Sequence, residues 1–243
     1  MELPVEQVKR KSEFTKGLQA GISIGIGYFP IALTFGLLAK STHLSLLDTV
    51  LMSVIVFAGA SQYISLNLLA AGVTGFEIVL TTFIVNIRHL LMAASLNEKM
   101  EEDAVWKKAL YAFGMTDETF SIAATQKGTV SSAYFFGVIF IAYTSWVVNS
   151  ALGHIVGANL PSVLQESMTI GLYAMFIGLL VPSMKQSAKV VHLAIIAASF
   201  NSIFVFSNVL SSGWAIVCST ILSSVIVEWI EQFRKKGVKL HAD

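Results

Sequence analysis

The sequence predicts an all-α integral membrane protein, a polytopic helical bundle, and three observations lead to that fold class. Of the 243 residues, 55% are hydrophobic and only 13% are charged, whereas a soluble domain carries about 25% charged residues. The charges are also segregated, because no Lys, Arg, Asp or Glu occurs in 17–39, 49–76, 128–165, 167–184 or 190–227. A membrane helix needs about 20 apolar residues. Finally, the apolar runs lack the alternating polarity of a membrane β-barrel.

Charged residues, glycines and prolines divide the chain into eight apolar segments, which predict about six to eight membrane helices. The segments are 17–39, 48–70, 76–96, 105–126, 133–154, 165–181, 190–209 and 213–230. The first contains Pro30 among several glycines, and the fourth is interrupted by Asp117 and Glu118. Both features indicate a broken or re-entrant helix.

The distribution of Lys and Arg predicts the orientation, since basic loops stay in the cytoplasm. If the first and fourth segments are broken or re-entrant, both tails, Lys40, the 99–108 loop, Lys127, Lys185 and Lys189 lie on one side. We therefore expect a cytoplasmic tail at 1–16, a single transmembrane transport domain at 17–230 and a second cytoplasmic tail at 231–243. If all eight segments cross instead, the basic 99–108 loop lies opposite the tails.

Composition and motifs also restrict the function. The net charge of +1 argues against a nucleic-acid partner. There is no His-Glu-x-x-His motif, no evident Ser/His dyad and no Walker A pattern, so we expect neither a metal nor a cofactor nor enzymatic activity. The single Cys218 forms no internal disulfide.

Spaced glycines suggest close helix packing, and a sparse echo suggests an internal repeat. Glycines 17, 21 and 25 lie on one helical face, which lets a neighbouring helix approach in lipid. A sparse internal echo places Pro30 and Gly36 about 117 residues before Val147 and Gly153, and internal repeats are common in secondary transporters.

The first polar group within the apolar runs comprises Gly59, Ala60, Ser61 and Gln62. Small side chains let a substrate or another helix meet backbone atoms, and the Gln62 amide can both donate and accept hydrogen bonds. Substrate binding and tight packing with an interhelical hydrogen bond explain this pattern equally well.

The second group is Asn86, Arg88 and His89. A charge deep in an apolar segment costs about 3 kcal/mol even on the mildest insertion scale, so Arg88 requires a partner. Its planar fork matches a substrate carboxylate. The alternatives are a structural ion pair and snorkelling toward the membrane surface.

The third group is Asp117 and Glu118, in the middle of the fourth segment. Adjacent side chains on a helix point about 100° apart, so one carboxylate can pair with Arg88 while the other faces a cavity and couples to protons. Alternatively, the segment lies at the interface and both acids are solvated.

In order and spacing, these groups resemble the AzlC family of bacterial inner-membrane permeases. The resemblance is carried by Ala-Gly-Ala-Ser-Gln at 58–62, Arg88-His89 and Phe-Gly-x-Thr-Asp-Glu at 113–118, and it extends over about 18–230. It implies a multi-pass inner-membrane protein that exports branched-chain amino acids with a small AzlD-like membrane subunit.

The local chemistry agrees with that implication, because a zwitterionic amino acid needs a cation, an anion and an apolar surface. Arg88, the acids at 117–118 and the small residues at 59–61 can supply them, and export would then draw on an ion gradient. The alternatives are a subunit for assembly that does not itself transport, and an intramembrane enzyme.

Overall fold

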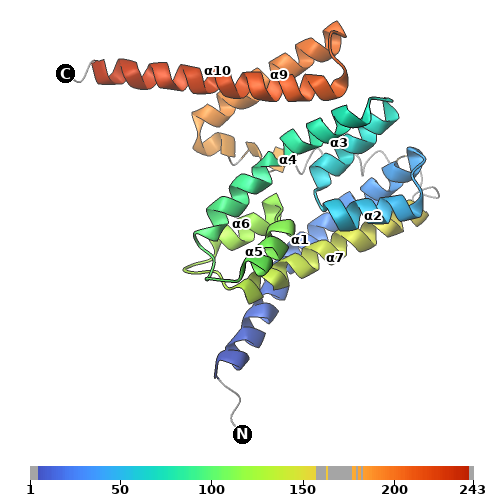
Figure 1. Cartoon of the computed structure of the whole chain (residues 1–243), viewed down its shortest axis with the longest axis vertical. Helices are drawn as coiled ribbons and strands as arrows, with labels where there is room; N and C mark the ends of the chain where they lie inside the picture. Colours follow the sequence, from blue (N-terminus) through green and yellow to red (C-terminus); the bar gives the residue numbers. More distant parts are fainter. Residues whose placement is uncertain (1–4, 157–162, 164–176, 179, 182, 241–243) are drawn as a thin grey trace. The chain divides into compact units, whose positions relative to one another are not determined.

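The computed structural model describes residues 5–156, 163, 177–178, 180–181 and 183–240, with side chains described only between 13 and 232. The described residues form helices and no strand beyond the isolated bridge between Met100 and Val130. The helices are α1 (Val5–Ser41), α2 (Leu46–Val56), α3 (Gly59–Ala70), α4 (Gly75–Asn97), α5 (Val105–Phe113), α6 (Asp117–Thr125), α7 (Ser132–Val156), α9 (Ala188–Ser207) and α10 (Ser212–Leu240) (Figure 1).

The prediction of an all-α membrane protein is confirmed. Among the described helices, five are long and apolar enough to cross a bilayer: Glu13–Ser41 of α1, α4, α7, α9 and Ser212–Gln232 of α10. The predicted segment at 165–181 lies largely outside the described residues. The chain forms two compact units, Met1–Leu66 with Val85–Gly171 and Asn67–Ile84 with Leu172–Asp243.

In the first unit, α1 and α7 pack side by side along most of their length. A methyl group at Gly17 would overlap the Tyr134 carbonyl, and one at Gly36 would overlap the Ser150 carbonyl. Both helices therefore run in the same direction, with their backbones in close contact. This confirms the close approach predicted from the glycines. Gly36 also lies beside Gly153, its counterpart in the sequence echo.

The break suggested for the first apolar segment is absent, because α1 continues through Pro30. Proline removes one backbone donor, but neighbouring helices can hold a membrane helix together across it. Here α7 contacts α1 at Gly21 before the proline and at Gly36 after it. The break instead falls in the second segment.

That second segment forms a hairpin, α2 and α3, that reaches the middle of α7 and turns back. Its start lies beside the C-terminal end of α7, where His154 Nε2 is 2.9 Å from the Leu44 carbonyl oxygen. Further along, the Tyr143 hydroxyl donates to the Val54 carbonyl at 2.8 Å. The two helices have 11 and 12 residues, so each spans about 17 Å, roughly half of a bilayer core.

The predicted break in the fourth segment is present and forms the opposite hairpin, α5 and α6. Tyr111 of α5 packs edge-on against Phe136 near the start of α7. Gly114, at the end of α5, contacts Ile139, which lies further along α7. Helix α6 then runs back toward the loop before α5. Lys99 of that loop donates a hydrogen bond to the Ala124 carbonyl, near the end of α6, at 2.6 Å. The two hairpins therefore enter the unit from opposite ends.

This arrangement corrects one part of the predicted orientation. The 99–108 loop and Lys127 lie at the end of the unit where Lys16 of α1 lies, because Lys16, Lys107 and Lys127 line one pocket. Lys40 lies at the other end of the unbroken α1. The expectation that Lys40 shares a side with the 99–108 loop and Lys127 is wrong, since it required a break in the first segment.

The second unit contains the start of α4 together with α9 and α10, and a buried carboxylate joins two of these helices. Glu77 is only 6% exposed, and its Oε1 accepts hydrogen bonds from the backbone N–H of Gly213 at 3.0 Å and of Trp214 at 3.2 Å. These N–H groups belong to the first turn of α10, which has no intrahelical acceptors for them. Glu77 thus caps α10 and fastens it to α4.

Candidate functional site

The first helix break is held by Gln62. Phe57, with φ 42° and ψ 45°, adopts the left-handed conformation and ends α2. The Gln62 side chain reaches back to accept the Ala58 N–H at 3.2 Å, and its amide nitrogen donates to Ser53 Oγ at 3.3 Å. The Trp146 indole of α7 also donates to Gln62 Oε1, at 3.0 Å. These contacts give Gln62 a packing role, and its predicted role in substrate binding stays a prediction.

The other residues predicted for this motif form the first turn of α3. A methyl group at Gly59 would come within 2.7 Å of the Trp146 ring, so this glycine allows α3 to contact α7. Ala60 and Ser61 are buried. Their backbone N–H groups precede the first intrahelical hydrogen bond, and α3 has no acidic residue in its first turn. This turn is thus positive in character and carries no side-chain anion.

The second break lies between α5 and α6 and, unlike the first, is followed by a helix turn that carries acidic side chains. Thr116 is the N-cap of α6, its hydroxyl accepting the Thr119 N–H at 3.3 Å. Asp117 and Glu118 occupy the first helical turn, where carboxylates complement the helix dipole. The Tyr28 hydroxyl of α1 donates to Glu118 Oε2 at 2.6 Å and lies 2.8 Å from Thr116 Oγ1.

Aromatic rings bring the two breaks together. Phe57 precedes the first break, Phe113 precedes the second, and their ring centroids are 6.4 Å apart. Both rings pack against Tyr143 of α7, at 5.0 and 6.1 Å respectively. The C-terminal ends of α2 and α5 therefore meet beside the middle of α7, next to the first turns of α3 and α6.

Helix α4 contacts both breaks through two residues. Asn86 Nδ2 donates to Ser61 Oγ at 2.9 Å, which joins α4 to the first turn of α3. Arg88 Nη1 lies 2.7 Å from Asp117 Oδ2, which joins α4 to the first turn of α6. The predicted pairing of Arg88 with one of the two acids is thus present, and Asp117 is the partner.

Two polar atoms of this cluster remain without partners. Asn86 Oδ1 and Arg88 Nε are buried and make no hydrogen bond among the described residues. Buried polar atoms are nearly always satisfied by protein, water or a ligand. One stretch of α4 therefore carries a buried acceptor and a buried donor that are unsatisfied among the described residues.

The structure brings together nearly all of the residues that the sequence singled out. His89 also lies on α4, half-buried, with no hydrogen bond among the described residues. Sequence reasoning missed Tyr28, Tyr143 and Trp146, which hold the two breaks from α1 and α7. Aromatic residues in apolar helices give no local signal of such contacts.

Chemically, the cluster offers groups of both signs within a membrane protein. The guanidinium of Arg88 and the first turn of α3 attract an anion, while Asp117 and Glu118 attract a cation. Broken helices whose ends face a common point are a recurring way for transporters to bind polar solutes within the bilayer.

Comparison with known proteins agrees with this interpretation. The family model described as AzlC protein matches residues 23–160. The inner membrane protein YgaZ of Escherichia coli is 30% identical over 94% of this chain and 97% of its own length. An uncharacterized membrane protein of Archaeoglobus fulgidus is 25% identical over 93% of this chain and 99% of its own.

A further relative has a transport function in its name. The branched-chain amino acid transport protein AzlC of Bacillus subtilis is 31% identical over 56% of this chain and 55% of its own length. No solved structure shows significant similarity. The family match and the relatives support a role in membrane transport, and the chain belongs to the AzlC protein family.

Proposed function

We propose that this chain is a permease subunit that exports branched-chain or related apolar amino acids across a bacterial inner membrane. The observation that carries the proposal is the meeting of two helix breaks of opposite charge character, linked by Asn86 and Arg88 of α4. The name of the Bacillus subtilis relative supports the choice of substrate.

The substrate carboxylate binds the free donors of Arg88 and the first turn of α3. Arg88 uses one donor for Asp117, and its buried Nε has no partner among the described residues. Arginine has five N–H donors in a planar fork, so an ion pair with one carboxylate leaves donors for a second. The backbone N–H groups of Gly59, Ala60 and Ser61 have no intrahelical acceptor, so this helix end favours an anion.

The substrate ammonium binds on the acidic side of the cluster. Glu118 accepts a hydrogen bond from Tyr28, and Asn86 Oδ1 is a buried acceptor without a partner among the described residues. The ring of Phe113, which packs against Phe57 and is exposed, offers an apolar surface that suits a branched aliphatic side chain. In this proposal an ion gradient drives export.

A small hydrophobic membrane subunit completes the transporter in this proposal. Purified chain, reconstituted into liposomes with and without a small AzlD-like membrane subunit, tests it by counterflow of labelled leucine. Leucine exchange that requires this chain is expected, with glycine exchanging poorly. Exchange by the small subunit alone would instead make this chain an assembly subunit.

A further inference from the structure

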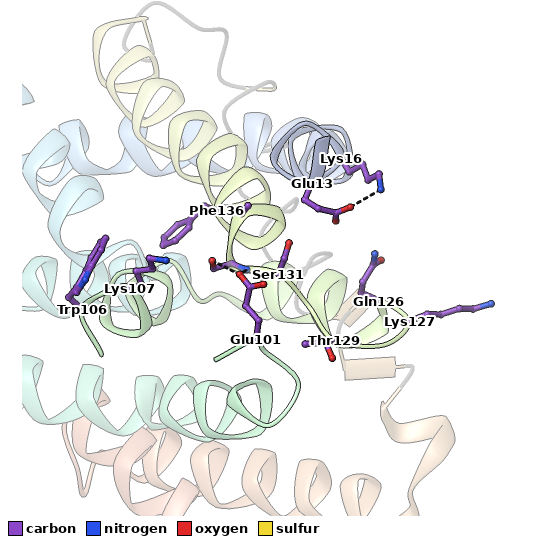
Figure 2. A pocket seen from close by; sticks show the side chains of 12 residues that line it. Glu13, Lys16, Glu101, Trp106, Lys107, Gln126, Lys127, Thr129, Ser131 and Phe136 are labelled. Carbon is purple, nitrogen blue, oxygen red and sulfur yellow. Dashed lines mark hydrogen bonds and ion pairs between the residues drawn. The ribbon is translucent and has the colours of Figure 1, made fainter. Parts of the chain in front are cut away.

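A pocket of about 730 Å³ with both polar and apolar lining lies at one end of the first unit, away from the helix breaks. Figure 2 shows residues from α1, α5, α7 and the two connecting loops around it. None of the residues assigned above to substrate binding lines this pocket. Its chemistry therefore requires a separate explanation.

The pocket lies at the depth of lipid headgroups. The charge-free run of α1 begins at Gly17 and α7 begins at Ser132, and the pocket is lined by Lys16 and Ser132 at these two positions. The ends of membrane-spanning helices coincide with the boundary between the hydrocarbon core and the polar headgroups. A ligand in this pocket is thus level with phospholipid phosphates, whichever side of the membrane it faces.

The polar side of the pocket suits a phosphate. Lys16, Lys107 and Lys127 all line it. Lys107 pairs with Asp103 at 2.9 Å, whereas Lys127 is exposed and has no ion pair among the described residues. The two acidic residues in the lining have internal partners. Glu13 pairs with Lys16 at 2.7 Å, and Glu101 accepts hydrogen bonds from the Ser132 N–H and hydroxyl at 2.9 and 2.8 Å.

The apolar side of the pocket suits an acyl chain. Trp106 lines the pocket, is 62% exposed and has the Lys107 ammonium 5.9 Å from its ring centroid. Val105 and Leu110 of α5 are also exposed. An indole beside a lysine is typical of a membrane interface. A free phosphate ion would use the lysines but would leave this apolar face of α5 uncovered.

We propose that this pocket binds the headgroup of an anionic phospholipid, with its phosphate at the lysines and an acyl chain along α5. Basic pockets between membrane helices on the cytoplasmic side bind anionic headgroups in this manner. The predicted cytoplasmic position of the 99–108 loop would place the lipid in the inner leaflet. This proposal concerns lipid binding and is independent of the transported substrate.

Native mass spectrometry of the purified protein tests the proposal with phosphatidylglycerol and phosphatidylcholine of identical acyl chains. Wild-type protein is expected to retain phosphatidylglycerol about fivefold better. Lys127→Glu and Lys16→Glu are each expected to remove that preference, because each lysine contributes about fivefold to binding of an anionic surface. Lys108→Glu is the matched control, since Lys108 lies on α5 outside the pocket lining.

Three outcomes would overturn the proposal. Equal retention of both lipids by wild-type protein would remove the headgroup preference. Loss of the preference in Lys108→Glu as well would indicate general surface charge. Displacement of phosphatidylglycerol by millimolar inorganic phosphate would identify a site for the free ion. Helicity by circular dichroism verifies folding, and Lys127→Arg is expected to retain the preference.

Discussion

The rings of Phe57 and Phe113 lie with their centroids 6.4 Å apart, and each marks the end of a helix that stops inside the protein. The contact connects two hairpins that enter from opposite ends of the same unit. Arg88 and Asn86 then join α4 to the helices that begin after each break. A substitution at either break is therefore expected to disturb the other break as well, and so to reduce transport.

Arg88→Lys is expected to insert normally and to lower leucine counterflow by about 10-fold or more. Lysine keeps the charge near Asp117 but loses the planar fork that lets Arg88 bind two carboxylates. The measurement is the initial rate in proteoliposomes, normalised to reconstituted protein. Transport at the wild-type rate with unchanged leucine affinity would leave Arg88 as a structural ion pair only.

Gly59→Leu is expected to reduce transport much more than membrane insertion. The added side chain meets the Trp146 ring, which is 2.7 Å from the position of a Cβ atom, yet it does not make the segment less apolar. Gly27→Leu is the matched control, because no atom lies within 4 Å of a Cβ at Gly27. Normal counterflow by well-expressed Gly59→Leu would exclude Gly59 from the pathway.

Glu77→Ala is expected to destabilise the protein by about 2 kcal/mol. The substitution leaves the N–H groups of Gly213 and Trp214 without their acceptor, and an unsatisfied buried donor costs about 1–3 kcal/mol. Thermal unfolding in detergent provides the measurement, with exposed Glu98→Ala as the control. Equal melting temperatures for the two variants would show that the capping by Glu77 contributes little.

Cysteines introduced at Lys40 and Lys99 are expected to face opposite sides of the membrane. In a Cys218→Ser background, an impermeant maleimide added to intact cells should label Lys40→Cys and leave Lys99→Cys unlabelled. Permeabilised cells should show labelling at both positions. Labelling of Lys99→Cys from outside would reverse the predicted orientation.

The fold class could be predicted from the sequence because apolar runs of membrane length depend only on composition. The break at Asp117 was also predictable, since two adjacent acids rarely continue an apolar helix. The break at Phe57 was not, because phenylalanine gives no local signal for a left-handed residue. It depends on the Gln62 cap and on packing against Tyr143 and Phe113.

The candidate site could be predicted in part for a related reason. Arg88 within an apolar segment required an anion. Asp117 was one of the two acids that lie in the middle of another apolar segment. The contact of Tyr28 with Glu118 joins α1 to α6, and such a long-range hydrogen bond follows only from the packing of α1 against the hairpin. Sequence reasoning therefore identified the charges but missed the aromatic residues that position them.

The central claim, that leucine binds where the two helix breaks meet, is tested most directly by substrate protection of Ser61→Cys in a Cys218→Ser background. Ser61 contacts Asn86, and cysteine is close to serine in size. Leucine is expected to slow alkylation of Ser61→Cys by a small thiol reagent, and Arg88→Lys should abolish this protection. Alkylation at the same rate with and without saturating leucine, in protein that still exchanges leucine, would contradict the claim.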